Sequence, residues 1–549
     1  MPLCHDSKRI GELCLRKGLL TEDQLREAVR EKERSRRLFG AILIEKDFLK
    51  KEQLDGVLAE QWGLPAADLK KKELSDPLRQ LIPAALAARH AIFPVSLTED
   101  ILTVAAADPF DSELLETLRL YTGKEIEAVY ASLEDIEQAI SRCYGVGADT
   151  VEQMTPRSRL GQEKLFLQPV ESEASVGKVL NQILNKAYQE RATDIHFEPG
   201  EHSLSVRFRV DGVLKMVSVP KNLWHFREAV NARVKILSRL NIAEKRLPQD
   251  GKFKFKTGGT ELDLRVSFVP STFGESLSIR VLNSARYLQL TELGLSPGVL
   301  YDLNRMLNKN SGMIFVTGPT GSGKTSTLYA AIHRLDRDSK KIITIEDPPE
   351  YQISGITQIQ VHPAIGLTFA AGLRSVLRHD PDIILIGEVR DHETAQISVQ
   401  SSLTGHLVLS TLHTNDAASG ITRLLEIGID PFLIASSVNC FIAQRLVRMI
   451  CPKCKEKDSR GHPDFEDVYR GKGCEDCRMT GYQGRTGIFE YLQIDDRIRA
   501  MIMERRSAVE IRRAAVETGM RLLYEHGADK VREGLTTPEE VLRVTQDDR

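Results

Sequence analysis

Residues 318–325 read Gly318-Pro319-Thr320-Gly321-Ser322-Gly323-Lys324-Thr325, and this stretch decides the fold of the chain. It follows an apolar run, 313–316, and opens a segment with helical character that reaches Leu335. In such a loop, glycines let successive backbone N–H groups turn inward around an anionic phosphate, and the positive end of the following helix adds to the attraction. The pattern therefore predicts a phosphate-binding loop between a buried strand and a helix.

Two residues of this loop have specific predicted roles in binding ATP. Lys324 is expected to reach the β- and γ-phosphates, and the Thr325 hydroxyl to coordinate Mg²⁺. The alternative is a glycine-rich turn that binds nothing, but the strand and the helix on either side favour the binding loop. The predicted ATP-binding residues are Gly318, Pro319, Thr320, Gly321, Ser322, Gly323, Lys324, Thr325 and Ser326.

The composition is that of an ordinary soluble protein with several domains. The 549 residues exceed what a single core supports and predict roughly three to five domains. Apolar residues make up 41% of the chain, and the net charge of −2 gives no general attraction to nucleic acid or anionic lipid. The N-terminus lacks a signal-peptide core, and no apolar run approaches the ~20 residues that span a bilayer. We therefore expect a cytoplasmic protein that meets a membrane only through partners.

The segment 1–62 contains an internal repeat of 29 residues. Its spacing fits two similar helix-turn-helix units, which can bury their apolar faces against each other. Packing alone would account for such a repeat, and a binding role is the alternative. The recurring positions are Gly11, Leu15, Leu19, Leu20, Leu25 and Val29, matched by Gly40, Ile44, Phe48, Leu49, Leu54 and Leu58.

Three further segments precede the phosphate loop. Residues 63–145 alternate short apolar runs with helical stretches, which predicts a small α/β module without recognisable chemistry. Residues 146–175 are polar, lack periodicity and contain two prolines, which is typical of a linker. In residues 176–290, a helix precedes strands in which apolar and polar side chains alternate. This α+β domain should have one apolar sheet face and one face that carries arginines.

The arginines on that second face have two interpretations. A polar face is most often simply solvated. Beside a nucleotide-binding domain, however, a guanidinium is a fixed fork that pairs with phosphate oxygens and stabilises charge on a transferring phosphoryl group. We therefore predict that Arg265 and Arg280 are arginine fingers, assisted by Arg207 or Arg209.

Three apolar runs after the phosphate loop end near Glu350, Glu388 and His413. Since open α/β sheets bind ligands at the carboxyl ends of their parallel strands, these side chains should converge near the phosphate loop. Hydrolysis needs one carboxylate to organise Mg²⁺, another to orient or deprotonate water, and a polar group that senses the γ-phosphate. A lone histidine is more often a hydrogen-bonded core residue, and only its position after a strand favours a role for His413.

Four of the eight cysteines form two close pairs. Cys451 and Cys454 are followed, after nineteen intervening residues, by Cys474 and Cys477, a spacing typical of two zinc knuckles. Four thiolates complete a tetrahedral shell and leave no position for water or substrate, so the zinc should be structural. A redox dithiol pair and four ordinary buried cysteines are the alternatives.

Several motifs resemble those of the type II secretion and type IV pilus assembly ATPases. The similarity runs from about residue 176 to the C-terminus. One departure is Pro349, which stands where the family more often has an aliphatic residue. The similar segments are 194–196, 248–251, 345–350 (the Asp box of the family), 387–391 (its Walker B segment), and 404–406 with 411–415 (its His box).

The resemblance implies roles for individual residues. Glu350 would be the catalytic glutamate, and Glu388 the Walker B residue that acts on Mg²⁺ through water. His406 and His413 would form the pair that senses the nucleotide. The family assembles as homo-hexamers in which arginines of the smaller domain reach the bound ATP, which agrees with the arginine fingers predicted above.

The fold class implied by the resemblance is α/β. A RecA-like parallel-sheet ATPase domain at 291–450 would follow a PAS-like α+β domain at 176–290 and an N-terminal regulatory α/β region. A zinc-knuckle insertion at 451–490 and a helical subdomain at 491–549 would complete the chain. In the family, docking to a membrane partner is associated with the cysteine element.

The segment from Arg9 to Lys32 also resembles the tandem cyclic-di-GMP-binding motif found at the N-terminus of some of these ATPases. The second unit departs from the motif, because Leu38 replaces its arginine and Asp47 replaces its glycine. Losing a cation and placing a carboxylate near a diphosphate should weaken binding. The candidate cyclic-di-GMP residues are Arg9, Gly11, Gly18, Gly40 and Gln61.

These features together predict a cytoplasmic hexameric ATPase, peripheral to the inner membrane, that drives type IV pilus assembly through an inner-membrane platform protein. Its cofactors would be ATP, Mg²⁺, structural Zn²⁺ and cyclic-di-GMP. Type II protein secretion is an alternative with the same chemistry. A nucleic-acid-translocating hexamer is an alternative of a different class, but the sequence has no basic tract to bind a strand, so no nucleic-acid partner is expected. The intact pair of carboxylates argues against a sensor that binds nucleotide without hydrolysing it.

Overall fold

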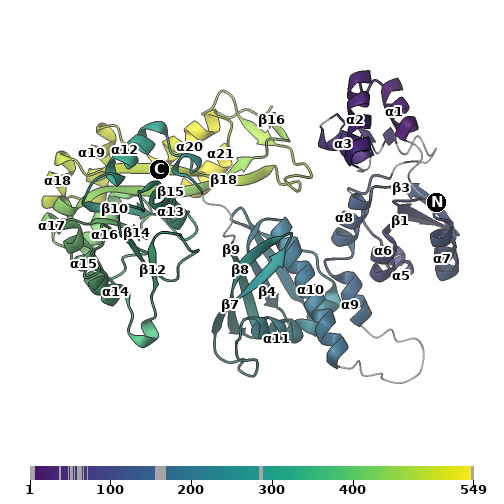
Figure 1. Cartoon of the computed structure of the whole chain (residues 1–549), viewed down its shortest axis with the longest axis horizontal. Helices are drawn as coiled ribbons and strands as arrows, with labels where there is room; N and C mark the ends of the chain where they lie inside the picture. Colours follow the sequence, from purple (N-terminus) through teal and green to yellow (C-terminus); the bar gives the residue numbers. More distant parts are fainter. Residues whose placement is uncertain are drawn as a thin grey trace. The chain divides into compact units, whose positions relative to one another are not determined.

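The computed structural model describes residues 7–545, apart from 36–38, 47, 50–52, 55, 58–64, 66, 71, 155–168 and 283–287. The chain divides into two compact units, Met1–Val281 and Leu282–Arg549. The first unit holds the N-terminal repeat, the small α/β module and the arginine-bearing domain. The second holds the phosphate loop, the four paired cysteines and the C-terminal helices (Figure 1).

The N-terminal repeat forms helices that pack in the same way twice. The helices are α1 (Ser7–Arg16), α2 (Glu22–Ser35) and α3 (Phe39–Glu45). A Cβ atom on Gly11 would lie 2.6 Å from Cδ1 of Leu25, and one on Gly40 would lie 2.8 Å from Cδ2 of Leu54. The same glycine–leucine contact therefore recurs after 29 residues, as the sequence repeat predicts. Ile44, which also belongs to the repeat, is exposed instead.

The following module is a small α/β unit, as predicted. Its elements are α5 (Asp76–Leu81), α6 (Ala84–His90), β1 (Ile92–Thr98), β2 (Ile101–Ala106), α7 (Ser112–Thr122), β3 (Glu125–Tyr130) and α8 (Leu133–Cys143). The three strands form one sheet in which β1 is antiparallel to β2 and β2 is parallel to β3. Phe93, Leu102 and Ile136 are fully buried in its core.

Part of the predicted linker is helical. It contains α9 (Ala148–Met154) and the start of α10 (Pro169–Gln189), while 155–168 lies outside the described residues. Val151 and Met154 are buried in the core of the arginine-bearing domain. Two apolar residues three positions apart are too short a pattern for a helix to be recognised in the sequence.

The arginine-bearing domain is a six-stranded sheet with helices packed on one face. Its further elements are β4 (Ala192–Pro199), β5 (Leu204–Val210), β6 (Val213–Val217), η1 (Lys221–Phe226), α11 (Arg227–Leu237), β7 (Gln249–Thr257), β8 (Thr260–Ser271) and β9 (Gly274–Leu282). The strand order is β6-β5-β4-β9-β8-β7. Apolar residues of α10 and α11 share one core with the apolar sheet face. The sequence pattern did not predict β4, because a register shift between Ala192 and Asp194 interrupts its alternation, or β7, whose large apolar residues are only Phe253 and Phe255.

The second unit is built on a seven-stranded sheet. Its elements around the phosphate loop are η2 (Leu290–Glu292), α12 (Pro297–Leu307), β10 (Gly312–Thr317), α13 (Lys324–Arg334), β11 (Ile342–Glu346), β12 (Thr357–Gln360), η3 (Pro363–Ile365), α14 (Phe369–Val376), β13 (Ile383–Ile386), α15 (His392–Leu403), β14 (Leu407–Leu412), α16 (Ala417–Glu426), α17 (Pro431–Ser437), β15 (Val438–Ile450) and β18 (Tyr482–Gln493). The strand order is β12-β11-β13-β14-β10-β15-β18.

Neighbouring strands of this sheet run parallel, except that β18 is antiparallel to β15. Along β10, Met313 and Phe315 belong to one hydrophobic core, and Ile314 and Val316 belong to another. The sheet is therefore buried on both faces, which is the usual arrangement of a parallel sheet. The predicted parallel sheet around the phosphate loop is confirmed.

The cysteine segment and the C-terminal helices extend this unit. The elements are β16 (Lys455–Lys457), β17 (Tyr469–Gly471), α18 (Asp496–Met503), α19 (Ala508–Glu517), α20 (Leu523–Arg532) and α21 (Pro538–Thr545). The cysteine segment connects β15 to β18, where Ile450 pairs with Tyr482. Ile498 and Val541 of the predicted helical C-terminus are buried in one of the two cores of the seven-stranded sheet. Among the described residues, no helix combines the length and the apolar character needed to cross a membrane.

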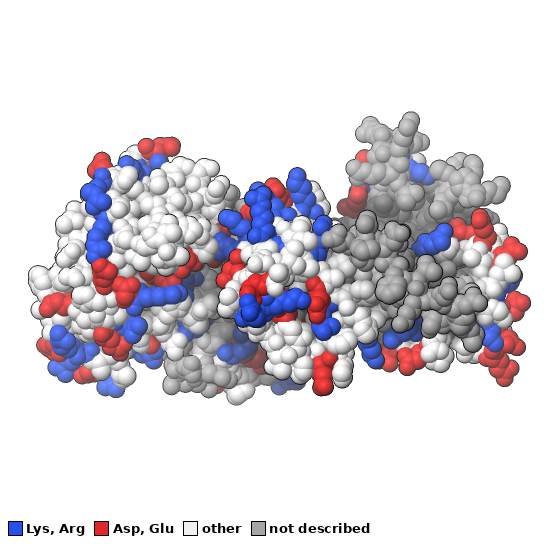
Figure 2. All heavy atoms as spheres, turned by 90° about the horizontal axis from the view of Figure 1, so that it is seen from below, with Lys and Arg blue, Asp and Glu red and all other residues white. Residues whose placement is uncertain are grey.

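Charged side chains of both signs are interspersed on the face of the molecule in Figure 2. Lysine and arginine side chains, in blue, lie beside aspartate and glutamate side chains, in red.

Candidate functional site

The phosphate loop has the backbone that its sequence predicts. β10 ends at Thr317, directly before the loop, and α13 begins with Lys324 at its far end. Gly318, Gly321 and Gly323 have φ angles of 145°, 80° and 90°. Because residues with a side chain rarely adopt such angles, these glycines allow the turn that aims backbone N–H groups at a phosphate.

Strand β15 supports the loop from the side. A Cβ atom on Gly318 would lie 2.6 Å from the carbonyl oxygen of Gln444, and one on Gly323 would lie 2.7 Å from Nε2 of Gln444. Thr327 of α13 donates a 2.7 Å hydrogen bond to Oε1 of the same glutamine. Sequence analysis did not identify Gln444, because only the parallel pairing of β10 with β15 brings it to the loop.

Lys324 lies within the loop, and its ammonium group is largely buried. Nζ donates to the carbonyl oxygens of Gly318, at 2.7 Å, and Pro319, at 3.1 Å. Burial lowers the pKa of Lys324 to about 8; the negative charge of Glu388 opposes this shift, and the positive charge of Arg445 adds to it. Lys324 and Glu388 therefore act on each other electrostatically within one site.

Glu388 and His413 meet at the carboxyl ends of β13 and β14. Oε2 of Glu388 lies 3.2 Å from Nε2 of His413 and 2.6 Å from Nε of Arg390. The Glu388 side chain is only 13% exposed. A pocket of about 690 Å³ lies beside this group and is lined by Val389, Arg390, Leu412, His413, Thr414, Asn415, Asp416, Ser419, Thr422, Arg423 and Glu426. The convergence of an acid and an imidazole is thus observed, and Arg390 joins them.

His406 lies at the other end of β14 and is not part of this group. β14 pairs in parallel with β10, with Leu412 opposite Thr317, just before the phosphate loop. His406 immediately precedes β14, so the strand separates it from His413 by roughly 20 Å. Its Nδ1 is 2.8 Å from the carbonyl oxygen of Ser401. The structure therefore does not bring His406 and His413 together, because a spacing of seven residues along a strand places two side chains at opposite edges of the sheet. The predicted sensing role of His406 stays a prediction.

Glu350 lies in the segment that follows β11. Its backbone N–H donates a 3.1 Å hydrogen bond to the hydroxyl of Tyr329 on α13. The residue is half-buried, and its Oε2 atom is shielded from solvent. Thr325, the predicted Mg²⁺ ligand, is exposed on the first turn of the same helix. The acid is thus tied to the helix that begins at the phosphate loop.

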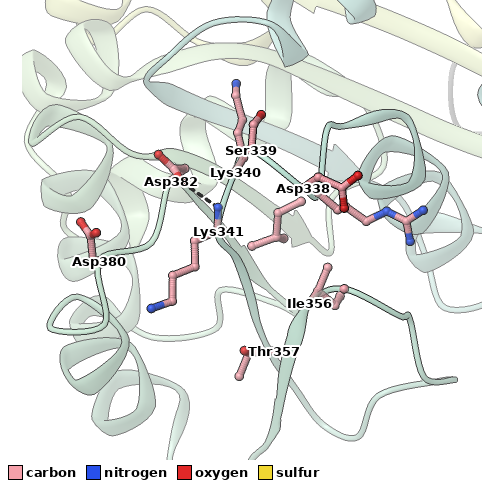
Figure 3. Close-up of a pocket in the computed structure, with 11 residues that line it drawn as sticks. Asp338, Ser339, Lys340, Lys341, Ile356, Thr357, Asp380 and Asp382 are labelled. Carbon is pink, nitrogen blue, oxygen red and sulfur yellow. Dashed lines mark hydrogen bonds between the residues drawn. The ribbon is translucent and has the colours of Figure 1, made fainter.

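A second pocket, of about 450 Å³, lies at the opposite edge of the sheet (Figure 3). Lys341, Thr357 and Asp382 line it, and they lie at the amino ends of β11, β12 and β13. The backbone N–H of Lys341 donates a 2.7 Å hydrogen bond to Oδ2 of Asp382. Since ligands of parallel sheets bind at the carboxyl ends, this pocket is not part of the nucleotide site.

The predicted arginine fingers lie on the open face of the sheet in the first unit. Nε of Arg280 is 2.9 Å from Oδ1 of Asp194, and Nε of Arg209 is 3.9 Å from Oδ2 of the same residue. The Arg280 side chain is nevertheless 57% exposed. Arg265 alternates along β8 with buried leucine and valine residues, so it shares this face. Arg207 pairs with Glu198.

The four paired cysteines form one compact cluster. The sulfur atoms of Cys451, Cys454, Cys474 and Cys477 all lie within 4.8 Å of one another. Three of the pairs are 3.7 Å apart, far longer than the ~2.05 Å of a disulfide. Four sulfurs bound tetrahedrally at ~2.3 Å from zinc would be separated by about 3.8 Å. The geometry of the cluster therefore fits a zinc ion.

The candidate cyclic-di-GMP residues are only partly described. Gly11 and Gly40 pack against leucines, as stated above, and Gly18 has a φ angle of 67°. The side chain of Arg9 and all of Gln61 lie outside the described residues.

Comparison with known proteins identifies the family. The family model described as "Type II/IV secretion system protein" matches residues 170–543, about two thirds of the chain. The chain belongs to this family. Its members hydrolyse ATP, so this secretion ATPase is an enzyme. A second model, the MshEN domain, matches residues 62–150, which include the small α/β module.

Relatives of this secretion ATPase serve two related machines. The chain is 40% identical over 568 residues to the type IV pilus assembly ATPase PilB of Myxococcus xanthus, with 99% of this chain and 100% of that protein covered. It is 50% identical over 375 residues to the type II secretion system protein HxcR of Pseudomonas aeruginosa, with coverages of 68% and 78%. The crystal structure of the ATPase DotB of Legionella pneumophila is similar in fold, with a TM-score of 0.50, 23% identity, and coverages of 71% and 98%.

Nucleotide affinity should depend on the charge of Lys324. Because its pKa is about 8 and bound phosphates favour the ammonium form, binding must take up a proton above that pH. The affinity for a non-hydrolysable ATP analogue, measured by calorimetry, should be flat from pH 6.5 to 7.5 and fall by up to about tenfold per pH unit above 8. Lys324→Arg, which stays charged, should remove this fall in affinity with pH. If the affinity of that variant falls as steeply as that of the wild type, another group takes up the proton.

The cysteine cluster should hold one structural zinc ion per chain. Elemental analysis of the purified protein should find one equivalent of zinc, and Cys454→Ala should lose it. A chelator should lower Tm, since even about 2 kcal/mol of lost stability corresponds to roughly 4–8 °C in a domain of this size. Cys143→Ser, which changes a half-buried cysteine of the first unit, is the matched control and should keep its zinc. Unchanged metal content and Tm in Cys454→Ala would refute the site.

Proposed function

We propose that this secretion ATPase works as a homo-hexamer at the cytoplasmic side of the inner membrane, where it drives type IV pilus assembly through a membrane platform protein. The observation that carries the proposal is the end-to-end match with the pilus assembly ATPase PilB, which includes the N-terminal parts of the chain. The type II secretion system protein E of Xanthomonas campestris also matches 89% of the chain, at 43% identity, and the match with the secretion protein HxcR spans 68% of the chain. Its higher identity of 50% favours type II secretion as the second candidate function.

The proposed chemistry of hydrolysis uses the residues gathered at the carboxyl edge of the ATPase sheet. The phosphates of ATP would lie in the loop, with Lys324 neutralising the β- and γ-phosphates. Thr325 and, through water, Glu388 would hold Mg²⁺, which supplies further charge neutralisation when bound. Glu350 would orient the attacking water and accept its proton as the bond to the leaving ADP breaks. His413, paired with Glu388, would respond to the γ-phosphate.

In this proposal, arginines of a neighbouring subunit complete the site. Arg280 and Arg265 would reach the γ-phosphate of the next copy, with Arg207 or Arg209 assisting. The support is the shared open face of these arginines and the anchoring of Arg280 by the largely buried Asp194, which orients a guanidinium that stays exposed. An oriented guanidinium loses little entropy when it meets a phosphate.

The remaining assignments concern regulation and partners. Zinc would stabilise the hairpin-like connection between β15 and β18, and this element would contribute to docking on the platform protein. The N-terminal repeat would bind cyclic-di-GMP, with the support of the motif around Arg9 and of its duplicated helical packing. Association with the membrane would occur through partners.

Arg280→Ala should lower kcat for ATP hydrolysis by about 10³-fold, since arginine fingers contribute this much or more. The affinity for a non-hydrolysable ATP analogue should change little, because the phosphate loop is intact. Arg246→Ala, which removes an exposed arginine of the same domain paired with Glu244, should behave like the wild type. Mixing Arg280→Ala chains with Lys324→Ala chains should restore part of the activity. In a mixed hexamer, the intact phosphate loop of an Arg280→Ala chain can meet the intact Arg280 of a neighbouring Lys324→Ala chain. Without such recovery, the arginine would act within its own subunit or not at all.

Deletion of the gene in its host should separate the two candidate functions. Surface pili, counted by electron microscopy, should disappear, while the set of secreted proteins should stay unchanged. The wild-type gene should restore pili, and a Glu350→Gln gene should not. Loss of secreted proteins with intact pili would instead support type II secretion.

A further inference from the structure

A chain of hydrogen bonds connects the helix that follows the phosphate loop to Glu350. Tyr329 lies on α13 and is 1% exposed. Its hydroxyl donates a short hydrogen bond to Oε2 of Glu346, the last residue of β11, which is 4% exposed. The oxygen of the same hydroxyl accepts the 3.1 Å hydrogen bond from the N–H of Glu350. One tyrosine therefore links the end of a central strand to the backbone of the proposed catalytic residue.

The direction of these hydrogen bonds is fixed by Glu346. Its Oε1 accepts hydrogen bonds from the hydroxyl of Thr344, at 2.6 Å, and from Nε2 of Gln358, at 3.3 Å. Since both carboxylate oxygens of Glu346 are acceptors, the hydroxyl of Tyr329 donates its hydrogen bond to Oε2 and turns a lone pair towards the N–H of Glu350. Burial, followed by the negative charge of Glu346, raises the pKa of Tyr329, so the hydroxyl keeps this proton at physiological pH.

The segment after Glu350 is held by the same group of residues. The rings of Tyr329 and Tyr351 meet edge to face, with centroids 4.7 Å apart. Nε2 of Gln358 donates to the carbonyl oxygen of Tyr351, at 3.1 Å, and its Oε1 accepts the N–H of Ile353, at 2.8 Å. The backbone at and beyond Glu350 is thus fixed by side chains of α13 and β12.

We propose that Tyr329 and Glu346 are positioning residues that hold Glu350 in register with the phosphate loop. Lys324 and Tyr329 lie on one helix, five residues and about 7.5 Å apart along its axis. The group that binds the phosphates and the group that would orient the water therefore share one rigid support. A small displacement of a catalytic group strongly slows a reaction that depends on alignment. This inference rests on the proposed role of Glu350.

Tyr329→Phe should lower kcat for ATP hydrolysis by tenfold or more while it changes the affinity for a non-hydrolysable ATP analogue by less than about twofold. The ring and its packing remain, but the N–H of Glu350 loses its acceptor and Glu346 loses a donor. Glu346→Gln should have a similar effect, because an amide presents a donor where the carboxylate presents an acceptor. The double variant should be no slower than the slower single variant, since both changes break one network. A wild-type kcat in Tyr329→Phe, an additive double variant, or equal losses of rate and affinity would each overturn the proposal.

Two further variants distinguish this inference from the proposed function. Tyr482→Phe removes a tyrosine hydroxyl that shares a 2.9 Å hydrogen bond with Thr537, outside the nucleotide site, and kcat should stay at the wild-type value. A lower kcat in this control would mean that losing a hydrogen-bonded tyrosine hydroxyl outside the site also slows the enzyme, and would overturn the inference. Glu350→Gln should abolish hydrolysis but retain nucleotide binding. If Glu350→Gln hydrolyses ATP normally, the proposed role of Glu350 fails; if it is inactive while Tyr329→Phe matches the wild type, only the positioning role fails.

Discussion

The parallel pairing of β10 with β14 and β15 is the constraint on which the nucleotide site depends. It aligns the end of β10 with the end of β14, so that the phosphate loop and His413 lie at one edge of the sheet. Pairing on the other side brings Gln444 against two glycines of the loop, closer than a Cβ atom would permit. The glycines therefore serve both the phosphate and the packing of the neighbouring strand. A loop with the same sequence but without this neighbour would lack the support that fixes its shape.

Charges in the site are arranged so that each is partly balanced before ATP binds. Lys324 is buried, and its pKa falls to about 8 despite the nearby negative charge of Glu388. Glu388 in turn lies between Arg390 and His413. Because a buried charge is costly unless it is paired, these contacts keep an acid and a cation close together at an edge of the sheet. When ATP and Mg²⁺ bind, the phosphates would pair with Lys324 and the metal ion would pair with Glu388. These new contacts would replace the present ones and so change the local structure.

Outside the nucleotide site, each part of the chain is stabilised by a different kind of interaction. The arginine-bearing domain buries one face of its sheet under α10 and α11 and leaves the other face for ion pairs such as Arg280–Asp194. The cysteine cluster is too small for a hydrophobic core, and its four sulfurs have the spacing of a metal site instead. The N-terminal repeat uses the same glycine–leucine contact twice.

The sequence by itself determined the features that depend on local patterns: the phosphate loop, the buried strands around it, the 29-residue repeat and the two cysteine pairs. The loop glycines, the apolar runs of the strands and the spacing of the cysteines can be recognised in the sequence, because each depends on residues that are close together along the chain. Only the tertiary structure decided which residues join the site. Gln444 and Arg390 were not identified, the contact between Tyr329 and Glu346 was invisible, and His406 was grouped with His413, although a whole strand separates them. Strand order and register arise from long-range packing, and a one-dimensional pattern does not contain them.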